Sequence, residues 1–97
     1  MKTLAEIENI IKKNKPSLLK EYCIKEIGIF GSIVKNEHTD NSDVDILVEF
    51  DEVPDLLKFI NLENKLEEML GIKVDLVQKK GIRPELKDYI LKEVVYI

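Results

Sequence analysis

Several residue types are nearly absent from the 97-residue sequence, which has one cysteine, one histidine, one arginine and no tryptophan. The single cysteine, Cys23, cannot form an internal disulfide, which excludes a disulfide-stabilised scaffold, and we expect it to be a small buried residue in a reducing compartment. No apolar run reaches the roughly 18 residues of a membrane span, and the charged N-terminal pattern lacks a signal-peptide core. We therefore expect a cytoplasmic protein that has no contact with a membrane.

The chain also has fewer positively than negatively charged residues. The 15 lysine and arginine residues are outnumbered by 19 aspartate and glutamate residues, which gives a formal net charge of −4. Because proteins hold the phosphate backbone through basic surface, this balance argues against direct nucleic-acid binding. It leaves open a nucleotide that is bound through metal ions, for which acidic side chains are needed.

The organisation of the chain is simple. Hydrophobic residues make up 44% of the sequence, an ordinary share for a globular protein, and no repeat, low-complexity segment or linker interrupts it. A chain of this length is expected to build one hydrophobic core. We therefore interpret residues 1–97 as a single domain.

Helices are predicted where apolar residues recur at helical spacing. Thr3 and Glu6 form a capping-box pattern that begins the first helix, and we expect Pro16 to break that helix and to open a shorter one over about residues 16–23. Pro54 is expected in the first turn of a long helix that Gly71 ends. The side chains expected to face the core are Leu56, Phe59, Leu66 and Met69 in this helix, and Leu86, Tyr89, Ile90 and Val94 in a last helix from about Pro84.

Strands are predicted over residues 24–30, 44–50 and 72–78, with a short fourth strand at the C-terminus as an option. The fold class that follows is α/β (α+β): a small mixed β-sheet of three to four strands with helices packed on one face.

Three aspartates are expected to share the other face of this sheet. Side chains alternate between the two faces of a strand, so Asp43 and Asp45 point away from the helices, as does Asp75 on the third strand. Three clustered carboxylates would raise one another's pKa. A divalent cation removes this conflict, and hard oxygen ligands favour Mg²⁺ or Mn²⁺.

A Gly-Ser step follows the first strand and supplies a complementary feature. Gly31 lets the backbone approach a ligand closely, and a helix that begins at Ser32 would direct free N–H groups at a phosphate. Lys35, about one turn later, adds a positive charge. These three residues are therefore candidates for nucleotide binding.

The combined pattern resembles a known family. Gly31-Ser32, ten intervening residues and Asp43-Val44-Asp45 are similar to the GS-x10-DxD signature of the minimal nucleotidyltransferases, in the polymerase-β-like nucleotidyltransferase superfamily. The similarity runs from about Ile24 to Tyr89. It implies the nucleotidyltransferase fold and the role of such members: antitoxins that transfer AMP from ATP to a tyrosine of a HEPN-type RNase toxin.

The resemblance also implies a role for each site residue. Asp43, Asp45 and Asp75 would be the catalytic carboxylates that bind two Mg²⁺ ions, with Mn²⁺ as an alternative. Gly31, Ser32 and Lys35 would hold the triphosphate of ATP. Many members of the family have an Arg-Gly pair where this chain has Lys35-Asn36, and lysine loses the bidentate fork of arginine.

Two other functions are compatible with these residues. The first is a non-catalytic nucleotide-binding or docking antitoxin of the same fold, and the second is a metal nuclease, which the Gly-Ser element and the acidic surface disfavour. His38 lies in a polar loop, Ser42 is expected to cap the turn before the second strand, and Glu49 lies too far along that strand to join the site. The acceptor residue, the preferred nucleotide, the number of AMP groups and the oligomeric state stay open.

Overall fold

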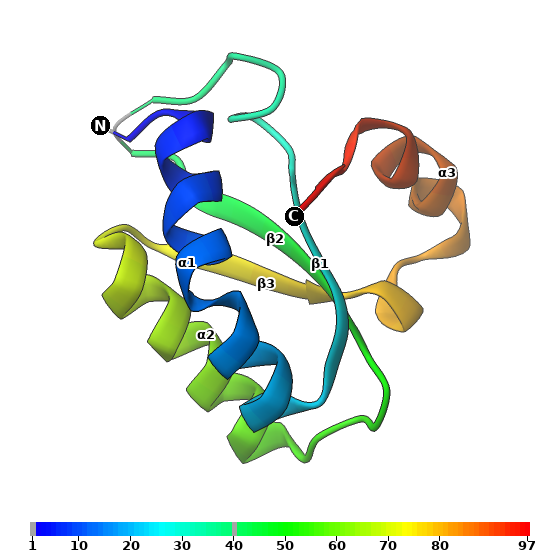
Figure 1. Ribbon diagram of the computed structural model, residues 1–97. Coiled ribbons are helices and arrows are strands. Elements are labelled where there is room, and N and C mark those ends of the chain that lie inside the picture. Colours follow the sequence, from blue (N-terminus) through cyan, green and yellow to red (C-terminus); the bar gives the residue numbers. More distant parts are fainter. Residues whose placement is uncertain (1, 40) are drawn as a thin grey trace.

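β2, one of the two inner strands of the sheet, is paired on both sides and carries Asp45. We describe a computed structural model that covers residues 2–39 and 41–97. The sheet has the order β3-β2-β1-β4; β1 is antiparallel to β2 and β4, and β3 is parallel to β2 (Figure 1). The strands are β1 (Ile24–Phe30), β2 (Val44–Phe50), β3 (Val74–Gln78) and β4 (Val95–Tyr96). The expected mixed sheet and its optional fourth strand are confirmed.

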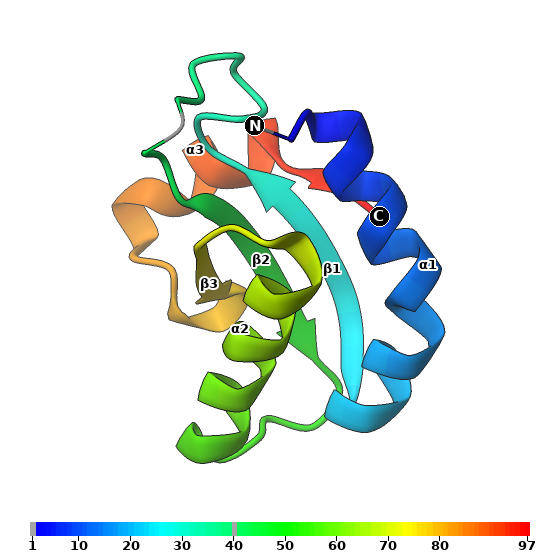
Figure 2. The same ribbon diagram turned by 90° about the vertical axis from the view of Figure 1, so that its left-hand side faces the viewer.

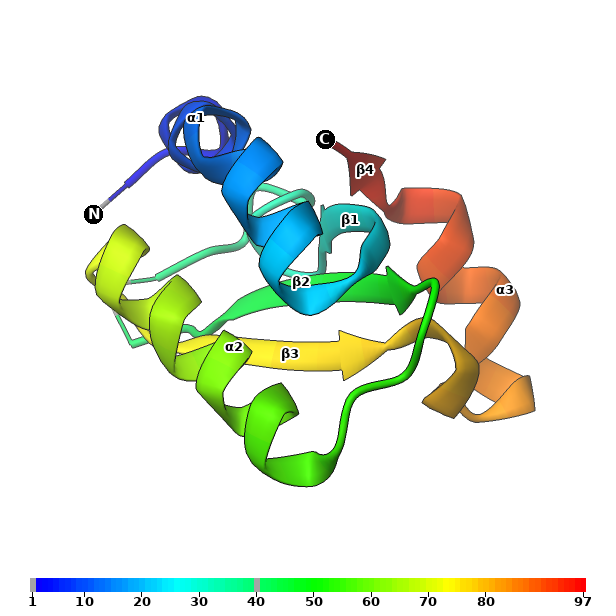
Figure 3. The same cartoon turned by 60° about the horizontal axis from the view of Figure 1, so that its bottom comes forward.

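Two long helices, α1 (Leu4–Tyr22) and α2 (Leu56–Leu70), cover one face of this sheet (Figures 1 and 3). The apolar residues of β2 alternate as predicted, and Val44, Ile46 and Val48 are each 0% exposed. They pack against buried stripes that the helices present, namely Ile7, Ile11, Leu18 and Tyr22 of α1 and Leu62, Leu66 and Leu70 of α2. This apolar layer fixes the register of the strands, and therefore the positions of the polar residues on the opposite face.

The predicted break at Pro16 is wrong, because α1 continues through it to Tyr22. A proline inside a helix costs about 3 kcal/mol. On both sides of Pro16, however, the buried stripe stays on one helical face, and Leu18 and Tyr22 bury side chains worth about 1.5–3 kcal/mol each. Pro16 itself is exposed. Burial of the stripe therefore outweighs the missing hydrogen bond.

Three local expectations are also corrected. Pro54 precedes α2 instead of lying in its first turn, since Asp55 is the N-cap and accepts a hydrogen bond from the N–H of Lys58; Leu56 is 72% exposed instead of facing the core. Cys23 is exposed and adopts a left-handed conformation at the end of α1. Gly71 ends α2 as predicted.

The outer edge of β3 is covered by side chains from α2. The N–H of Val74 donates to Glu67 Oε2 at 2.9 Å, and the N–H of Leu76 donates to Glu63 Oε2 at 3.0 Å. The strand begins at Val74, two residues later than predicted. These two glutamates satisfy backbone donors that an edge strand otherwise leaves to solvent.

The turn and the helix that follow β3 lie on the opposite side of the sheet from α1 and α2 (Figure 2). A 3-10 turn, η1 (Lys79–Gly81), leads into α3 (Pro84–Glu93), and Figure 2 shows the sheet between α2 and α3. The side chains of α3 that we expected to face the core stay accessible, with Leu86 46% and Tyr89 56% exposed. No described helix combines the length and the low polarity that crossing a bilayer requires.

The segment after α3 packs directly on the backbone of β1 at Gly28. A Cβ at this position would lie 2.7 Å from Val94 Cγ2 and 3.1 Å from the carbonyl oxygen of Val95. Leu47, the β2 partner of Gly28, is 1% exposed, which shows that the face opposite α1 and α2 is closed at this point. Glycine at position 28 therefore lets the C-terminal segment dock beside the site.

We predict that Gly28→Ala destabilises the fold by about 1–3 kcal/mol, the usual cost of overpacking. Gly81→Ala is the matched control, because a Cβ there meets no atom within 4 Å, and it should leave the free energy of unfolding almost unchanged. Urea denaturation of both variants measures the difference. Equal stability of the two variants would contradict the close docking at Gly28.

Candidate active site

Strand register brings the predicted site residues of three strands into one row. Asp45 on β2 pairs with Phe30 on β1 and with Asp75 on β3. Gly31 follows Phe30 directly, so it lies on one side of Asp45 while Asp75 lies on the other. The structure thus brings Gly31 and Asp75 to either side of Asp45. Strand alternation predicted that the two aspartates share a face.

Asp43 lies just before β2, and it is exposed, as is Asp75. It borders a groove of about 410 Å³, whose other lining residues are His38, Asn41, Ser42, Gly71, Ile72 and Lys73. Within residues 2–39 and 41–97, no three acidic, histidine or cysteine side chains are grouped closely enough to hold a metal ion as they stand. The three-aspartate metal site therefore remains a prediction that requires some side-chain rearrangement.

Asp45 is the electrostatically strained member of the group. Burial raises its pKa to about 6, and the negative charges of Asp75, Asp43 and Glu93 act in the same direction, against a smaller opposing effect from Lys35. A carboxylate with these neighbours favours a bound cation. The all-oxygen donor set and the crowding of negative charge fit Mg²⁺ or Mn²⁺.

Gly31 is required by both its conformation and its surroundings. Its φ of +83° lies in the region that favours glycine. A Cβ at this position would overlap Asp45 Oδ2 and lie 2.9 Å from Asp45 Cγ. The backbone of the Gly-Ser step therefore lies against the central carboxylate, with no room for a side chain between them.

The residues after Gly31 form hydrogen-bonded turns, whereas the sequence predicted a helix from Ser32. The carbonyl of Gly31 accepts from the N–H groups of Val34 at 3.1 Å and Lys35 at 3.2 Å. The N–H groups of Ser32 and Ile33 precede the first hydrogen bond of the turn, as they do at the start of a helix. The predicted phosphate contact of these backbone donors stays a prediction.

Asn36 explains part of the departure from the family pattern. Its φ is +61°, in the left-handed region where glycine is favoured and asparagine is among the best tolerated other residues. Asparagine can therefore replace the glycine of the Arg-Gly pair without changing the backbone. The change from arginine to Lys35 keeps the positive charge but not the planar fork.

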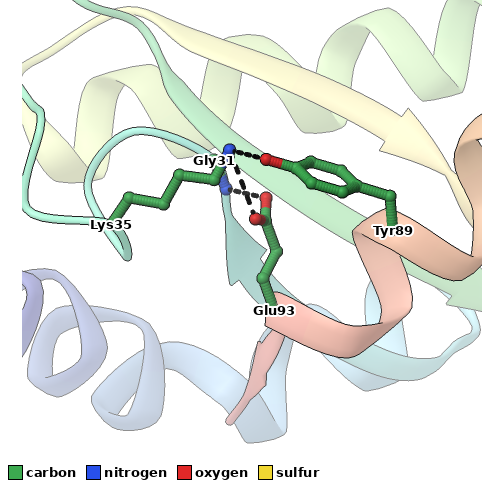
Figure 4. A network of polar contacts seen from close by, with 4 residues as sticks. All are labelled: Gly31, Lys35, Tyr89 and Glu93. Carbon is green, nitrogen blue, oxygen red and sulfur yellow. Dashed lines mark hydrogen bonds and ion pairs between the residues drawn. The ribbon is translucent and has the colours of Figure 1, made fainter.

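Lys35 is held by α3, which sequence reasoning did not connect to the site. Its Nζ donates a hydrogen bond to the hydroxyl of Tyr89 and lies 3.4 Å from Glu93 Oε2, while Glu93 Oε1 accepts the N–H of Gly31 at 3.0 Å (Figure 4). The hydrogen bond to Tyr89, and then the charge of Glu93, raise the pKa of Lys35. Tyr89 and Glu93 are four residues apart on one helix. That spacing was the only signal in the sequence, and it did not show which face α3 turns to the sheet.

The remaining polar candidates lie at the margins of the site. Ser42 Oγ accepts the N–H of Thr39 at 3.1 Å, which confirms its role in the turn. His38 is half-buried beside Asp43 in the groove. Glu49 lies four residues after Asp45 on β2, and its carboxylate is 3.9 Å from Lys79 Nζ.

We predict that Asp45→Asn stabilises the ligand-free protein above about pH 6. A carboxylate whose pKa is raised from 3.8 to about 6 on folding favours the folded state fully only below the unfolded value, and this contribution is lost as pH rises through about 6. The full effect would be about 3 kcal/mol. Because solvent still reaches this carboxylate, we expect about 1–2 kcal/mol.

Denaturation of wild type and Asp45→Asn from about pH 4 to about pH 8 measures this effect. The advantage of the variant should be near zero at the acidic end and should grow between the two pKa values. A variant that is less stable at every pH would show that Asp45 is a structural residue.

Comparison with known proteins identifies the family. The family model described as "Nucleotidyltransferase domain" matches residues 4–97. The protein adenylyltransferase MntA of Thermococcus cleftensis is 50% identical over 97 residues, which are 100% of this chain and 98% of that protein. A Methanocaldococcus jannaschii protein, provisionally named for the same activity, is 51% identical over 98 residues that cover 100% of both chains.

Solved structures with the same fold include complexes of toxins and antitoxins. A chain in a crystal structure of a toxin–antitoxin pair with AMP-PNP is 28% identical and has a TM-score of 0.74, over 92% of this chain and 70% of that one. A structure of a tri-AMPylated Shewanella oneidensis HEPN toxin with its MNT antitoxin has a TM-score of 0.67 at 23% identity, over 93% of this chain and 70% of that one, and shows the fold alone. With the family match over residues 4–97, these findings show that the chain belongs to the nucleotidyltransferase domain family.

Proposed function

We propose that this nucleotidyltransferase is a protein adenylyltransferase antitoxin, which transfers AMP from ATP to a tyrosine of a HEPN-type toxin in the cytoplasm. The observation that carries the proposal is the row of Gly31, Asp45 and Asp75, in which a glycine backbone lies against a crowded carboxylate. The full-length similarity to a protein adenylyltransferase supports the activity. The structure of a toxin–antitoxin pair with AMP-PNP supports the kind of partner.

The residues have distinct tasks in this reaction. The backbone N–H groups of the Gly31-Ser32 step and the charge of Lys35 would hold the triphosphate, and Asp43, Asp45 and Asp75 would hold the divalent ions. When bound, such ions neutralise phosphate charge and lower the pKa of an attacking hydroxyl. Asp75 is exposed and would accept the proton of the tyrosine hydroxyl. The tyrosine oxygen would form the new bond to the α-phosphorus, and the bond from that phosphorus to pyrophosphate would break.

In this proposal the acceptor tyrosine belongs to the partner protein. Asp43 and Asp75 are both exposed, so the acceptor side of the row is open to a large substrate. A bound partner would exclude water from this side and would complete the site.

A non-catalytic nucleotide-binding or docking antitoxin is the second candidate. It is favoured by one observation: Gly31 and Lys35, the proposed triphosphate ligands, are already engaged by Glu93. A docking module would inhibit its partner equally well with its aspartates replaced, and the enzyme would not.

A transfer assay with labelled ATP and the purified HEPN partner tests the proposal. We predict that Asp43→Asn and Asp75→Asn each reduce transfer about 100-fold or more, because each removes a ligand of a charge-neutralising ion. Glu49→Gln is the matched control, since it removes a carboxylate that contacts Lys79 at 3.9 Å, farther along β2. Full inhibition of the toxin by the aspartate variants would favour the docking module.

The Gly-Ser step is tested by a pair of glycines with similar backbone conformations. Gly31 and Gly71 have φ of +83° and +70°, but a Cβ at Gly71 meets no atom within 4 Å. Both alanine variants should lose about 1–2 kcal/mol of stability from the left-handed conformation. Gly31→Ala should lose more, because its Cβ would also overlap Asp45 Oδ2. We predict that only Gly31→Ala also loses affinity for Mg-ATP, by about tenfold or more.

Isothermal titration calorimetry of Mg-ATP, below the melting temperature of both variants, provides the comparison. If Gly71→Ala binds Mg-ATP as tightly as wild type, the left-handed strain alone does not weaken nucleotide binding. Normal binding by Gly31→Ala as well would disprove the phosphate-binding role of this step.

A further inference from the structure

Glu93 makes two contacts, and each is with a residue proposed to bind the triphosphate. Its Oε1 accepts the N–H of Gly31 at 3.0 Å, and its Oε2 lies 3.4 Å from Lys35 Nζ. Its side chain is 15% exposed, compared with 34% for Lys35. Figure 4 shows the carboxylate facing both the backbone nitrogen of Gly31 and the side-chain nitrogen of Lys35.

A backbone N–H and a lysine ammonium around one anionic group form a common pattern for binding a phosphate oxygen. Anionic oxygens are held by backbone N–H groups together with a lysine ammonium, through charge-assisted hydrogen bonds. Glu93 supplies the same chemistry from within the chain. A phosphate group could not share these donors with it, because the two anions would repel each other at this distance.

We propose that the Glu93 carboxylate occupies a phosphate position of the nucleotide site and acts as an internal competitor that the triphosphate must displace. The inference rests on the proposed function in one respect, namely that Gly31 and Lys35 are triphosphate ligands. It adds a competing contact within the chain, in which the last residue of α3 occupies both donors. Nucleotide binding then requires the Glu93 side chain to leave both donors.

The packing of α3 permits this exchange. None of its residues is buried, and Tyr89, the other partner of Lys35, is 56% exposed. The next residues are fixed, since Val94 and Val95 lie against Gly28 and β4 pairs with β1. The Glu93 side chain can therefore move without loss of core contacts, while the C-terminal segment keeps α3 beside the site.

A role in which Glu93 only positions the triphosphate ligands predicts the opposite change in affinity when Glu93 is removed. If Glu93 served only to position Gly31 and Lys35 for the triphosphate, its removal would weaken binding. If it competes with the triphosphate, its removal strengthens binding. The direction of the change in affinity therefore decides between the two roles, independently of transfer activity.

The experiment compares wild type, Glu93→Gln and Glu85→Gln by calorimetric titration with Mg-ATP and, separately, with inorganic tripolyphosphate. Glu93→Gln keeps the size of the side chain but removes its charge. Glu85→Gln makes the same change of charge in the first turn of α3 and is the matched control. We expect Glu93→Gln to bind both ligands about tenfold more tightly than wild type, and Glu85→Gln to match wild type.

Tripolyphosphate is included because it reports on the phosphate position without any contribution from the base. Equal or weaker binding of both ligands by Glu93→Gln overturns the inference, even if wild type transfers AMP to a partner. Tighter binding of tripolyphosphate by this variant supports it, even if no transfer is found and the proposed function fails. Should Glu93→Gln not fold, Glu93→Asp carries the same test, because its shorter side chain cannot keep both contacts; unchanged affinity in that variant would also overturn the inference.

Discussion

Asp45 lies on the inner strand β2, where burial and the charges of three neighbouring carboxylates all oppose its ionisation. Much of the molecule can be understood as the support for this one group. The apolar layer of α1 and α2 holds β2 in register, pairing with β3 brings Asp75 beside it, and pairing with β1 brings Gly31 against it. A sheet that held these groups less firmly would separate the carboxylates and release the repulsion. The packing of the core is therefore what keeps these negative charges crowded around Asp45.

The parts of this arrangement that depend on local pattern were predictable. Alternation along residues 44–50 fixes which side chains of β2 enter the core, and it places Asp45 on the other face. The same rule applied to β3 gives Asp75 its side. Gly31 could be predicted as a position that needs glycine, because a glycine between a strand and a polar segment is typical of a backbone that lies close to another group. The structure supplies the reason, which is the carboxylate of Asp45.

The parts that depend on tertiary packing were not predictable. The break at Pro16 failed because local propensity says nothing of the burial available to Leu18 and Tyr22 on the far side of the proline. Leu56 satisfies a helical apolar pattern, yet it lies at the end of α2 beyond the reach of the sheet. Glu93 was missed because a single glutamate near the end of a helix carries no pattern. Its contacts with Gly31 and Lys35 depend on the path of α3 across the sheet.

The glutamates that cover β3 have a consequence for how a partner can approach. Many proteins recognise an extended segment by adding it as a further strand at an open sheet edge. Here the N–H groups of Val74 and Leu76 already donate to Glu67 and Glu63, and the edge strand at the other end, β4, spans only Val95–Tyr96. Strand addition at β3 would have to expel two carboxylates from their backbone partners. Recognition of a partner through side chains on a folded surface would leave these backbone hydrogen bonds intact.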